Sequence, residues 1–167
     1  MSRSLHSLFV GGAVALLLAA CAAQPVYDSH PGARLPTPSQ AATSPMTAHG
    51  RSVEWGGTVI DVQNLADRTE IQVLGYPLER SGRPDLTAAP HGRFLVVQSG
   101  FLEPKDYAPG RQLTVYGRLE GIVQGRIGDA TYAYPRVLAS QLQLWPTSGQ
   151  GPLPSNVQFG IGIGIGL

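Results

Sequence analysis

A single cysteine, Cys21, ends an apolar run close to the start of the chain. Arg3 gives a charged beginning, the stretch Leu8 to Leu18 is apolar, and two alanines precede the cysteine. This order is typical of an export signal, and the apolar run is too short to span a bilayer as a helix. We therefore expect residues 1–20 to be removed, which would leave Cys21, with its thiol, at a new N-terminus.

The four residues ending at Cys21 read Leu-Ala-Ala-Cys and resemble the lipobox of bacterial lipoproteins, in which the cysteine thiol takes a diacylglycerol group. An ordinary secretory signal or a short buried helix are the alternatives. Two or three acyl chains, at about 0.8 kcal/mol per buried methylene, would make the membrane attachment effectively permanent. Ala22 stands where inner-membrane lipoproteins usually carry Asp. The resemblance therefore implies an outer-membrane location, anchored at Cys21 and facing the periplasm.

Other residues that could do chemistry form no recognisable constellation. His6 lies in the signal, His30 and His49 lie in a polar stretch, and His91 lies beside a turn. The sequence therefore does not indicate the three or four convergent ligands that a metal site requires. Ser99 lacks the Gly-x-Ser-x-Gly elbow of a nucleophilic serine. Four carboxylates in two predicted loops could pair as acid and base, although loop carboxylates usually face water; they are Glu79, Asp85, Glu103 and Asp106. We predict no catalytic residue, no metal and no cofactor.

Five tyrosines are the remaining candidates for ligand contact: Tyr76, Tyr107, Tyr116, Tyr132 and Tyr134. On a barrel surface they could form a stacking platform for a sugar or a peptide. Tyrosines near strand ends also commonly pack on the rim of a core with the hydroxyl in water, and we favour this second interpretation.

Composition limits the class of protein. The chain has 167 residues, 12 basic and 11 acidic side chains and a net charge of +1, which gives no electrostatic case for binding nucleic acid. The 21 glycines and 14 prolines favour turn-rich β structure with linkers over helices. A single cysteine excludes an internal disulfide, so stability must come from a packed core.

Residues 21–50 are rich in Pro, Ser, Thr and Ala and show no apolar periodicity. Such a segment buries too little surface to offset its ordering entropy, so we predict a disordered tether. The 29 residues after Cys21 would reach about 30 Å as a flexible coil. The folded domain would then stand clear of the membrane.

Residues 51–145 carry six short strand signals and no competing helical pattern, and we predict an all-β domain. The clearest strand is Leu113 to Glu120, whose odd positions are expected to face the core. Gly56 and Gly57 interrupt the first strand and suggest a bulge or a sharp bend. A small antiparallel OB-like barrel is our first choice of fold and a small sandwich the second. The other expected strands are 53–62, 69–74, 94–98, 131–134 and 136–145, the last with Leu138, Ser140, Leu142 and Leu144 on one face.

Residues 146–167 form a Gly-rich tail in which apolar side chains occupy every second position from Val157 to Leu167. Low-complexity disorder, docking as an extra strand on an open sheet edge, and contact with a partner or lipid are the three interpretations.

The folded region resembles the Slp family of outer-membrane lipoproteins. The residues that carry this resemblance, besides the lipobox, are Trp55-Gly56-Gly57, Glu70-Ile71-Gln72-Val73, Tyr76-Pro77-Leu78, Gly82-Arg83-Pro84, Gly92-Arg93-Phe94, Tyr107 with Gly110, Thr114-Val115-Tyr116-Gly117, Tyr132-Ala133-Tyr134-Pro135 and Leu144-Trp145. The resemblance implies a lipid-anchored, non-enzymatic envelope protein of a Gram-negative bacterium, in a family linked to starvation or stress. It brings no catalytic residues.

Three functions follow as hypotheses. The first is a structural or interaction lipoprotein of the outer membrane, whose protein or glycan partner is unknown. The second is a module that binds a small ligand, glycan or peptide through the loops 75–92 and 101–110. The third, an envelope hydrolase, is the least supported.

Overall fold

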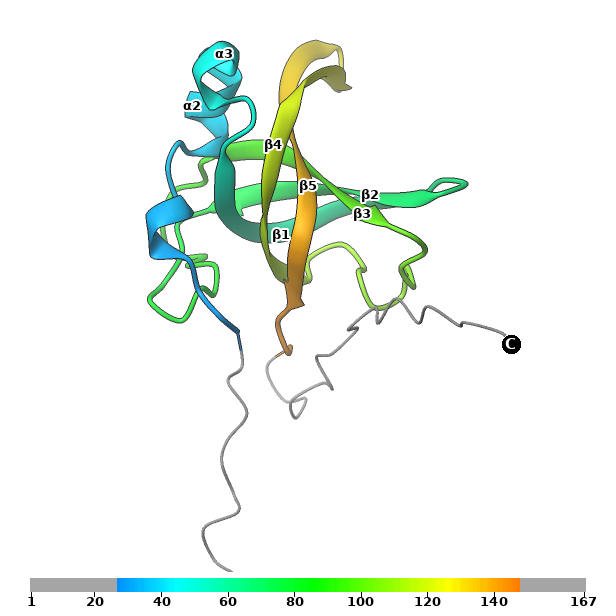
Figure 1. The fold of residues 1–167 in the computed structure, drawn as a ribbon. Helices are drawn as coiled ribbons and strands as arrows, with labels where there is room; N and C mark the ends of the chain where they lie inside the picture. Colours follow the sequence, from blue (N-terminus) through cyan, green and yellow to red (C-terminus); the bar gives the residue numbers. More distant parts are fainter. Residues whose placement is uncertain (1–26, 148–167) are drawn as a thin grey trace, which may run out of the picture.

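Five strands form one sheet that closes on itself in the computed structural model, which describes residues 27–147 (Figure 1). Around the ring the strand order is β1-β2-β3-β5-β4, and β4 pairs with β1 to complete it. The strands are β1 (Ser52–Asn64), β2 (Arg68–Tyr76), β3 (Gly92–Ser99), β4 (Gln112–Ile127) and β5 (Ala130–Leu144). The protein is thus mostly β, and the single closed sheet replaces the two-sheet sandwich considered as the second choice.

The prediction of a purely antiparallel sheet is wrong at one contact. β3 and β5 run parallel, with Val96 beside Val137, while the other neighbouring pairs are antiparallel. The reason is parity: strand direction cannot alternate all the way around a closed ring of five. At least one neighbouring pair must be parallel, and here it is β3–β5. The sheet is therefore mixed.

Two predicted strands near the C-terminal end are one strand. β5 continues through Pro135, and β4 continues through the glycine-punctuated segment, where the sequence predicts a connection. Pro135 is tolerated because this part of β5 pairs only with β4, opposite Ile122, and its contact with β3 begins at Arg136. The six strand signals therefore give five strands.

A register shift also corrects the predicted inner face of β5. Gln141 pairs with Tyr116 and Ala139 with Gly117, so Ser140 is an extra residue in β5. Beyond such a bulge the alternation changes phase. Val137 is buried and Ala139 packs on the core, whereas Ser140 is exposed. The predicted common face of Leu138, Ser140, Leu142 and Leu144 is thus wrong, because only Leu142 and Leu144 of these four pack against the core.

The inside of the ring holds the hydrophobic core. Trp55 packs its ring edge-on against Phe94, with 5.3 Å between the ring centroids. The odd positions of β4 from Leu113 to Leu119 are buried, as their alternation predicts. The other buried apolar residues on the strands of this cluster are Val53, Val59, Ile71, Val73, Val96 and Val137.

Glycines permit the strands to close. β1 pairs with β4 through Ser52 to Thr58 and with β2 from Gly56 onward, so it turns across the ring at the predicted Gly56–Gly57 bend. A side chain at Gly57 would overlap the Leu74 carbonyl, and one at Gly117 would overlap the Leu138 carbonyl. The register shift in β1 lies between Val59 and Asp61, just beyond the bend.

The prediction of a disordered tether is wrong for residues 27–50, which we call the N-terminal strap. They form η2 (Pro31–Ala33), α2 (Pro38–Thr43) and α3 (Pro45–Ala48) and run along the outside of the sheet before entering β1 (Figure 1). Ala41 and Ala48 are buried in the core cluster, and Ser39 N donates to His91 O. Small side chains and backbone hydrogen bonds order a segment whose composition indicated disorder. The tail at 148–167 and the signal lie outside the described residues.

Within residues 27–147 no helix has the length and apolar character needed to cross a membrane. The two longest connections are 77–91 between β2 and β3 and 100–111 between β3 and β4, close to the predicted loops.

We predict that Gly57→Ala destabilises the domain, because its methyl group would overlap the Leu74 carbonyl. Such overpacking costs about 1–3 kcal/mol, which corresponds to a fall in melting temperature on the order of 5–10 °C. Gly32→Ala is the matched control, since its methyl group would meet no atom within 4 Å. Thermal unfolding followed by circular dichroism checks both, and equal melting temperatures would contradict the close approach of β1 and β2.

Candidate functional site

A buried carboxylate lies on the outer side of the ring. Glu54 lies between Val53 and Trp55 on β1, whose side chains face the core, so its own side chain lies on the outer face of the sheet. It would be exposed on a bare sheet, yet only 1% of its surface is accessible, because the N-terminal strap covers it. A carboxylate removed from water in this way must be compensated by donors.

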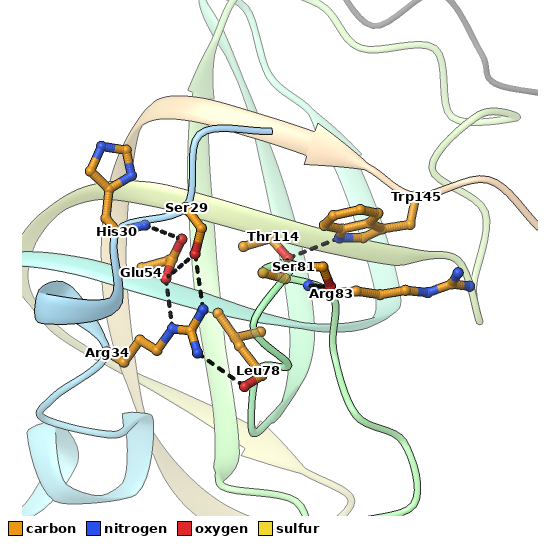
Figure 2. A network of polar contacts seen from close by, with 10 residues as sticks. Ser29, His30, Arg34, Glu54, Leu78, Ser81, Arg83, Thr114 and Trp145 are labelled. Carbon is orange, nitrogen blue, oxygen red and sulfur yellow. Dashed lines mark hydrogen bonds and ion pairs between the residues drawn. The ribbon is translucent and has the colours of Figure 1, made fainter. Parts of the chain in front are cut away.

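Three residues of the strap supply those donors (Figure 2). The Arg34 Nε donates to Glu54 Oε2 at 2.9 Å, the His30 backbone N–H donates to Oε1 at 2.7 Å, and the Ser29 hydroxyl donates to Oε2 at 3.4 Å. We call these four residues the Glu54 clamp. They join the strap to β1 across a sequence separation of 20 to 25 residues.

Arg34 also links the clamp to the β2–β3 loop. Its Nη1 donates to the Leu78 carbonyl at 3.1 Å and its Nη2 donates to Ser29 Oγ at 2.9 Å. The guanidinium therefore holds β1, the strap and the loop together, with about a quarter of the side chain left accessible. A planar group with five donors suits this role better than a lysine would.

Aromatic contacts flank the clamp. The His30 ring stacks on Tyr116 of β4, with 3.8 Å between centroids and 9° between planes. Tyr27, at the start of the strap, meets Trp145 edge-on at 6.0 Å. The indole of Trp55 donates to the Pro36 carbonyl at 2.8 Å, so even the core tryptophan is tied to the strap.

Thr114 fixes the end of the ring near Tyr27. Its hydroxyl donates to the Gly82 carbonyl at 2.7 Å and accepts a hydrogen bond from the Trp145 indole at 2.9 Å (Figure 2). A side chain at Gly82 would collide with the Tyr27 ring. Strap, loop and the end of β5 are thus packed together at one pole of the ring, which we call the Tyr27 pole.

The electrostatics of the clamp favour the ionised carboxylate. Burial alone would raise the pKa of Glu54, but the hydrogen bonds from the His30 N–H and the Arg34 guanidinium outweigh it and hold the pKa below its ordinary value. Burial raises the pKa of the Tyr27 phenol, and the nearby Glu54 charge raises it further. Tyr27 therefore stays neutral beside an ionised Glu54.

The clamp is not arranged as a catalytic triad. Ser29 Oγ is engaged by both Glu54 and Arg34, and Glu54 accepts from the backbone of His30 and not from its ring. The imidazole stacks on Tyr116, and its Nδ1 is buried with no hydrogen-bond partner among the described residues. The base that accepts from the Ser29 hydroxyl is the Glu54 carboxylate, which is also engaged by the Arg34 guanidinium and the His30 N–H, and no imidazole bonds this hydroxyl among residues 27–147. The arrangement therefore differs from a Ser-His-Asp triad and joins the strap to β1.

A small cavity of about 220 Å³ lies beside the clamp. Its walls are mainly apolar and come from the strap, β1, the end of β2 and both ends of the β2–β3 loop. Arg34, Glu54 and His91 also line it. The principal apolar walls are Leu35, Pro38, Trp55, Tyr76 and Leu78.

The candidate residues from the sequence are not brought together. Asp85 accepts hydrogen bonds from the backbone and hydroxyl of Thr87, which lower its pKa. The Ser81 hydroxyl donates a hydrogen bond to Glu79, and Glu103 and Asp106 are exposed in the β3–β4 loop. Glu79 and Asp85 thus bind neighbouring residues of their own loop. Among residues 27–147 no group of three or more potential metal ligands converges.

The five tyrosines are likewise dispersed. Tyr107 packs against the core, and Tyr134 is 3% exposed and tilted against Tyr132 at 4.7 Å. Tyr116 is covered by His30, and Tyr76 lines the cavity. Core and rim packing therefore describes them better than a common platform. Cys21 and His6 lie outside the described residues.

Sequence reasoning missed the Glu54 clamp. Glu54 alternates with apolar residues as a solvent-facing strand residue would, and Arg34 lies in a segment whose composition predicts a tether. The one available signal was Glu54 beside the Trp-Gly-Gly stretch, because a glycine pair in a strand often marks close approach of another segment.

Comparison with known proteins identifies relatives over most of the chain. Residues 18–158 match the model of the outer membrane lipoprotein Slp family. The "Uncharacterized lipoprotein YeaY" of Escherichia coli (strain K12) is 32% identical over 149 residues, which are 87% of this chain and 75% of that protein. The "Outer membrane protein Slp" of the same strain is 33% identical over 96 residues, 58% of this chain and 50% of that protein.

A further relative comes from Haemophilus influenzae and is described as an "Uncharacterized protein". It is 35% identical over 112 residues, which are 66% of this chain and 61% of that protein. The alignments thus span between half and three quarters of the length of these relatives.

We predict that Glu54 contributes stability that depends on pH. A carboxyl whose folded pKa lies below its ordinary value of 4.5 stabilises the fold above that pH, and the contribution is lost as the pH falls through the folded value. The difference in unfolding free energy between the unmodified protein and Glu54→Gln should therefore be constant near pH 7 and shrink below about pH 4.5. Urea unfolding at a series of pH values measures it.

Glu103→Gln is the control for this series, because Glu103 is exposed in the β3–β4 loop. It should leave the unfolding free energy nearly unchanged at every pH. A Glu54→Gln difference that grows on acidification would contradict the favourable ionised state of the clamp.

Proposed function

The chain belongs to the outer membrane lipoprotein Slp family, and we propose that it is anchored by acyl chains on Cys21 in the inner leaflet of the outer membrane, with its folded domain in the periplasm. The observation that carries this proposal is the family match, which begins at Leu18 and so includes the Leu-Ala-Ala-Cys stretch. Ala22 in place of Asp supports the outer membrane as the destination.

The folded domain is an OB-like barrel. The ring order β1-β2-β3-β5-β4 and the single parallel β3–β5 contact support this assignment. Barrels of this type often act as binding modules. The assignment describes the scaffold and leaves the function to the groups that it carries.

The role of the domain is structural or interactive and not enzymatic, in a protein linked to envelope integrity under starvation or stress. The clamp supports this, because its polar groups are engaged with one another: Glu54, which accepts from the Ser29 hydroxyl, also accepts from the Arg34 guanidinium and the His30 N–H. The relatives do not narrow the role further, because their names state no activity and the alignments cover 75% and 50% of the two Escherichia coli proteins.

A second function is favoured by the cavity beside the clamp. Its volume of about 220 Å³ and its mainly apolar wall would suit one small apolar group, such as a side chain of a peptide or a short aliphatic chain. The loop that the sequence predicts to bind ligands contributes Pro77, Leu78 and His91 to this wall. The module would then bind a small ligand or peptide from the periplasm.

We predict that Cys21→Ser abolishes lipidation. The hydroxyl cannot replace the thiol that receives the diacylglyceryl group, so the product should remain unprocessed or diffuse freely, and it should not incorporate a labelled fatty acid. Fractionation of cells grown with labelled palmitate checks this. A Cys21→Ser variant that still sediments with outer membranes at the mature mass would overturn the anchor.

Ala22→Asp is the matched variant, because it leaves the thiol in place. It should keep the fatty acid label but move the protein to the inner-membrane fraction. If it stays in the outer membrane, the sorting argument from Ala22 fails while the anchor itself stands.

We also predict that photocrosslinking in intact cells distinguishes the two functions. Met46 and Phe101 are the most exposed large apolar side chains among the described residues, with 94% and 68% of their surface accessible. A photoreactive residue at either position should capture one dominant envelope protein if the role is interaction. Capture of no protein at both positions, with a photoreactive residue at the exposed Asp129 as control, would favour the small-ligand function.

A further inference from the structure

The N-terminal strap shortens the connection between the domain and its anchor. The sequence suggests 29 residues of tether after Cys21, but the strap is ordered from Tyr27 onward. Only six peptide units separate Cys21 from Tyr27, and six residues span at most about 22 Å when fully extended. The folded domain is therefore held much closer to the point of lipidation than the tether length indicates.

The strap is fixed to the ring at several independent places. Tyr27 contacts Trp145, Arg34 of the clamp binds Glu54, and the Pro36 carbonyl accepts a hydrogen bond from the Trp55 indole. Farther along, Gly50 N donates to the Leu119 carbonyl. Release of the strap would require breaking these contacts together, so the short connection is a property of the folded state.

The short connection begins at one pole of the ring. Tyr27 lies beside Gly82 and the end of β5, whereas the tip of the β4–β5 hairpin at Gly128 and Asp129 lies at the opposite end (Figure 1). The 15 residues of β5 bridge the two ends and can span about 45 Å. This distance is about twice the reach of the six residues.

We propose that the Tyr27 pole faces the lipid surface in which the chain is anchored and that the β4–β5 hairpin points away from it. An inverted domain would need the anchor to reach along the whole of β5, which six residues cannot do. The occupant of this face is a phospholipid headgroup surface, and the inference rests on the proposed lipid anchor at Cys21. The strap is then the element that sets the orientation.

Energy transfer on lipid vesicles tests the orientation. Cys21 is the only cysteine of the chain and its thiol is consumed when it takes the diacylglyceryl group, so Ser81→Cys and Asp129→Cys each provide one labelling site in the lipidated protein. Ser81 is exposed next to Gly82 at the Tyr27 pole, and Asp129 is exposed at the hairpin tip. With an acceptor dye on the phosphatidylethanolamine headgroups, transfer from position 81 should be several-fold more efficient than from position 129.

A longer connection provides the control that leaves the fold unchanged. About twenty Gly/Ser residues inserted between Ala23 and Gln24 add about 25 Å of root-mean-square reach, so transfer from position 81 should fall toward that from position 129. Equal transfer from both positions without the insertion, or no response to the insertion, would overturn the orientation. Protein that lacks the acyl mass and does not float with vesicles would instead overturn the anchor, and the orientation with it.

Discussion

The position of the strap depends on one carboxylate, Glu54, which is buried although it lies on the outer face of its strand. Glu54 belongs to the outer face of β1, where a charge ordinarily needs no protein partner. Because the strap covers it, it must receive donors from the strap itself, and it receives them from Arg34, Ser29 and the backbone of His30. Breaking such a buried pair by removing one partner is far more costly than never forming it. The clamp therefore fixes where the strap lies.

This constraint extends beyond the clamp because its partners are shared. Arg34 also binds the Leu78 carbonyl, so the course of the β2–β3 loop depends on the same guanidinium. In this loop the Gly82 carbonyl accepts a hydrogen bond from the Thr114 hydroxyl, and that hydroxyl accepts one from the Trp145 indole just after β5. The cavity lies among these segments, so its walls are only as fixed as the clamp that joins them.

The alternation of side chains and the spacing of glycines predicted the core-facing residues of β4 and the bend in β1 well. The buried odd positions of β4 and the bend at Gly56–Gly57 follow from side-chain period and from the absence of a Cβ. A parallel contact could also have been predicted, because parity requires at least one parallel pair in any closed ring of five, although parity does not say that the pair is β3–β5. The local sequence pattern could not predict the bulge in β5 or the contacts on the outer face of the sheet. The inserted Ser140 shifts the alternation of β5, and the donors for Glu54 come from a segment whose composition alone indicates disorder.

A domain held by a short connection offers only part of its surface to other molecules. With the Tyr27 pole toward lipid, the accessible end carries the β4–β5 hairpin and the two helices of the strap (Figure 1). Both have exposed apolar side chains, Val123 on β4 and Met46 on α3, and α3 packs against β4. A soluble partner approaching from the periplasm would meet this end first. Under the proposed orientation, the strap would therefore turn the Tyr27 pole toward the membrane and also place the exposed Met46 at the end that faces away from it.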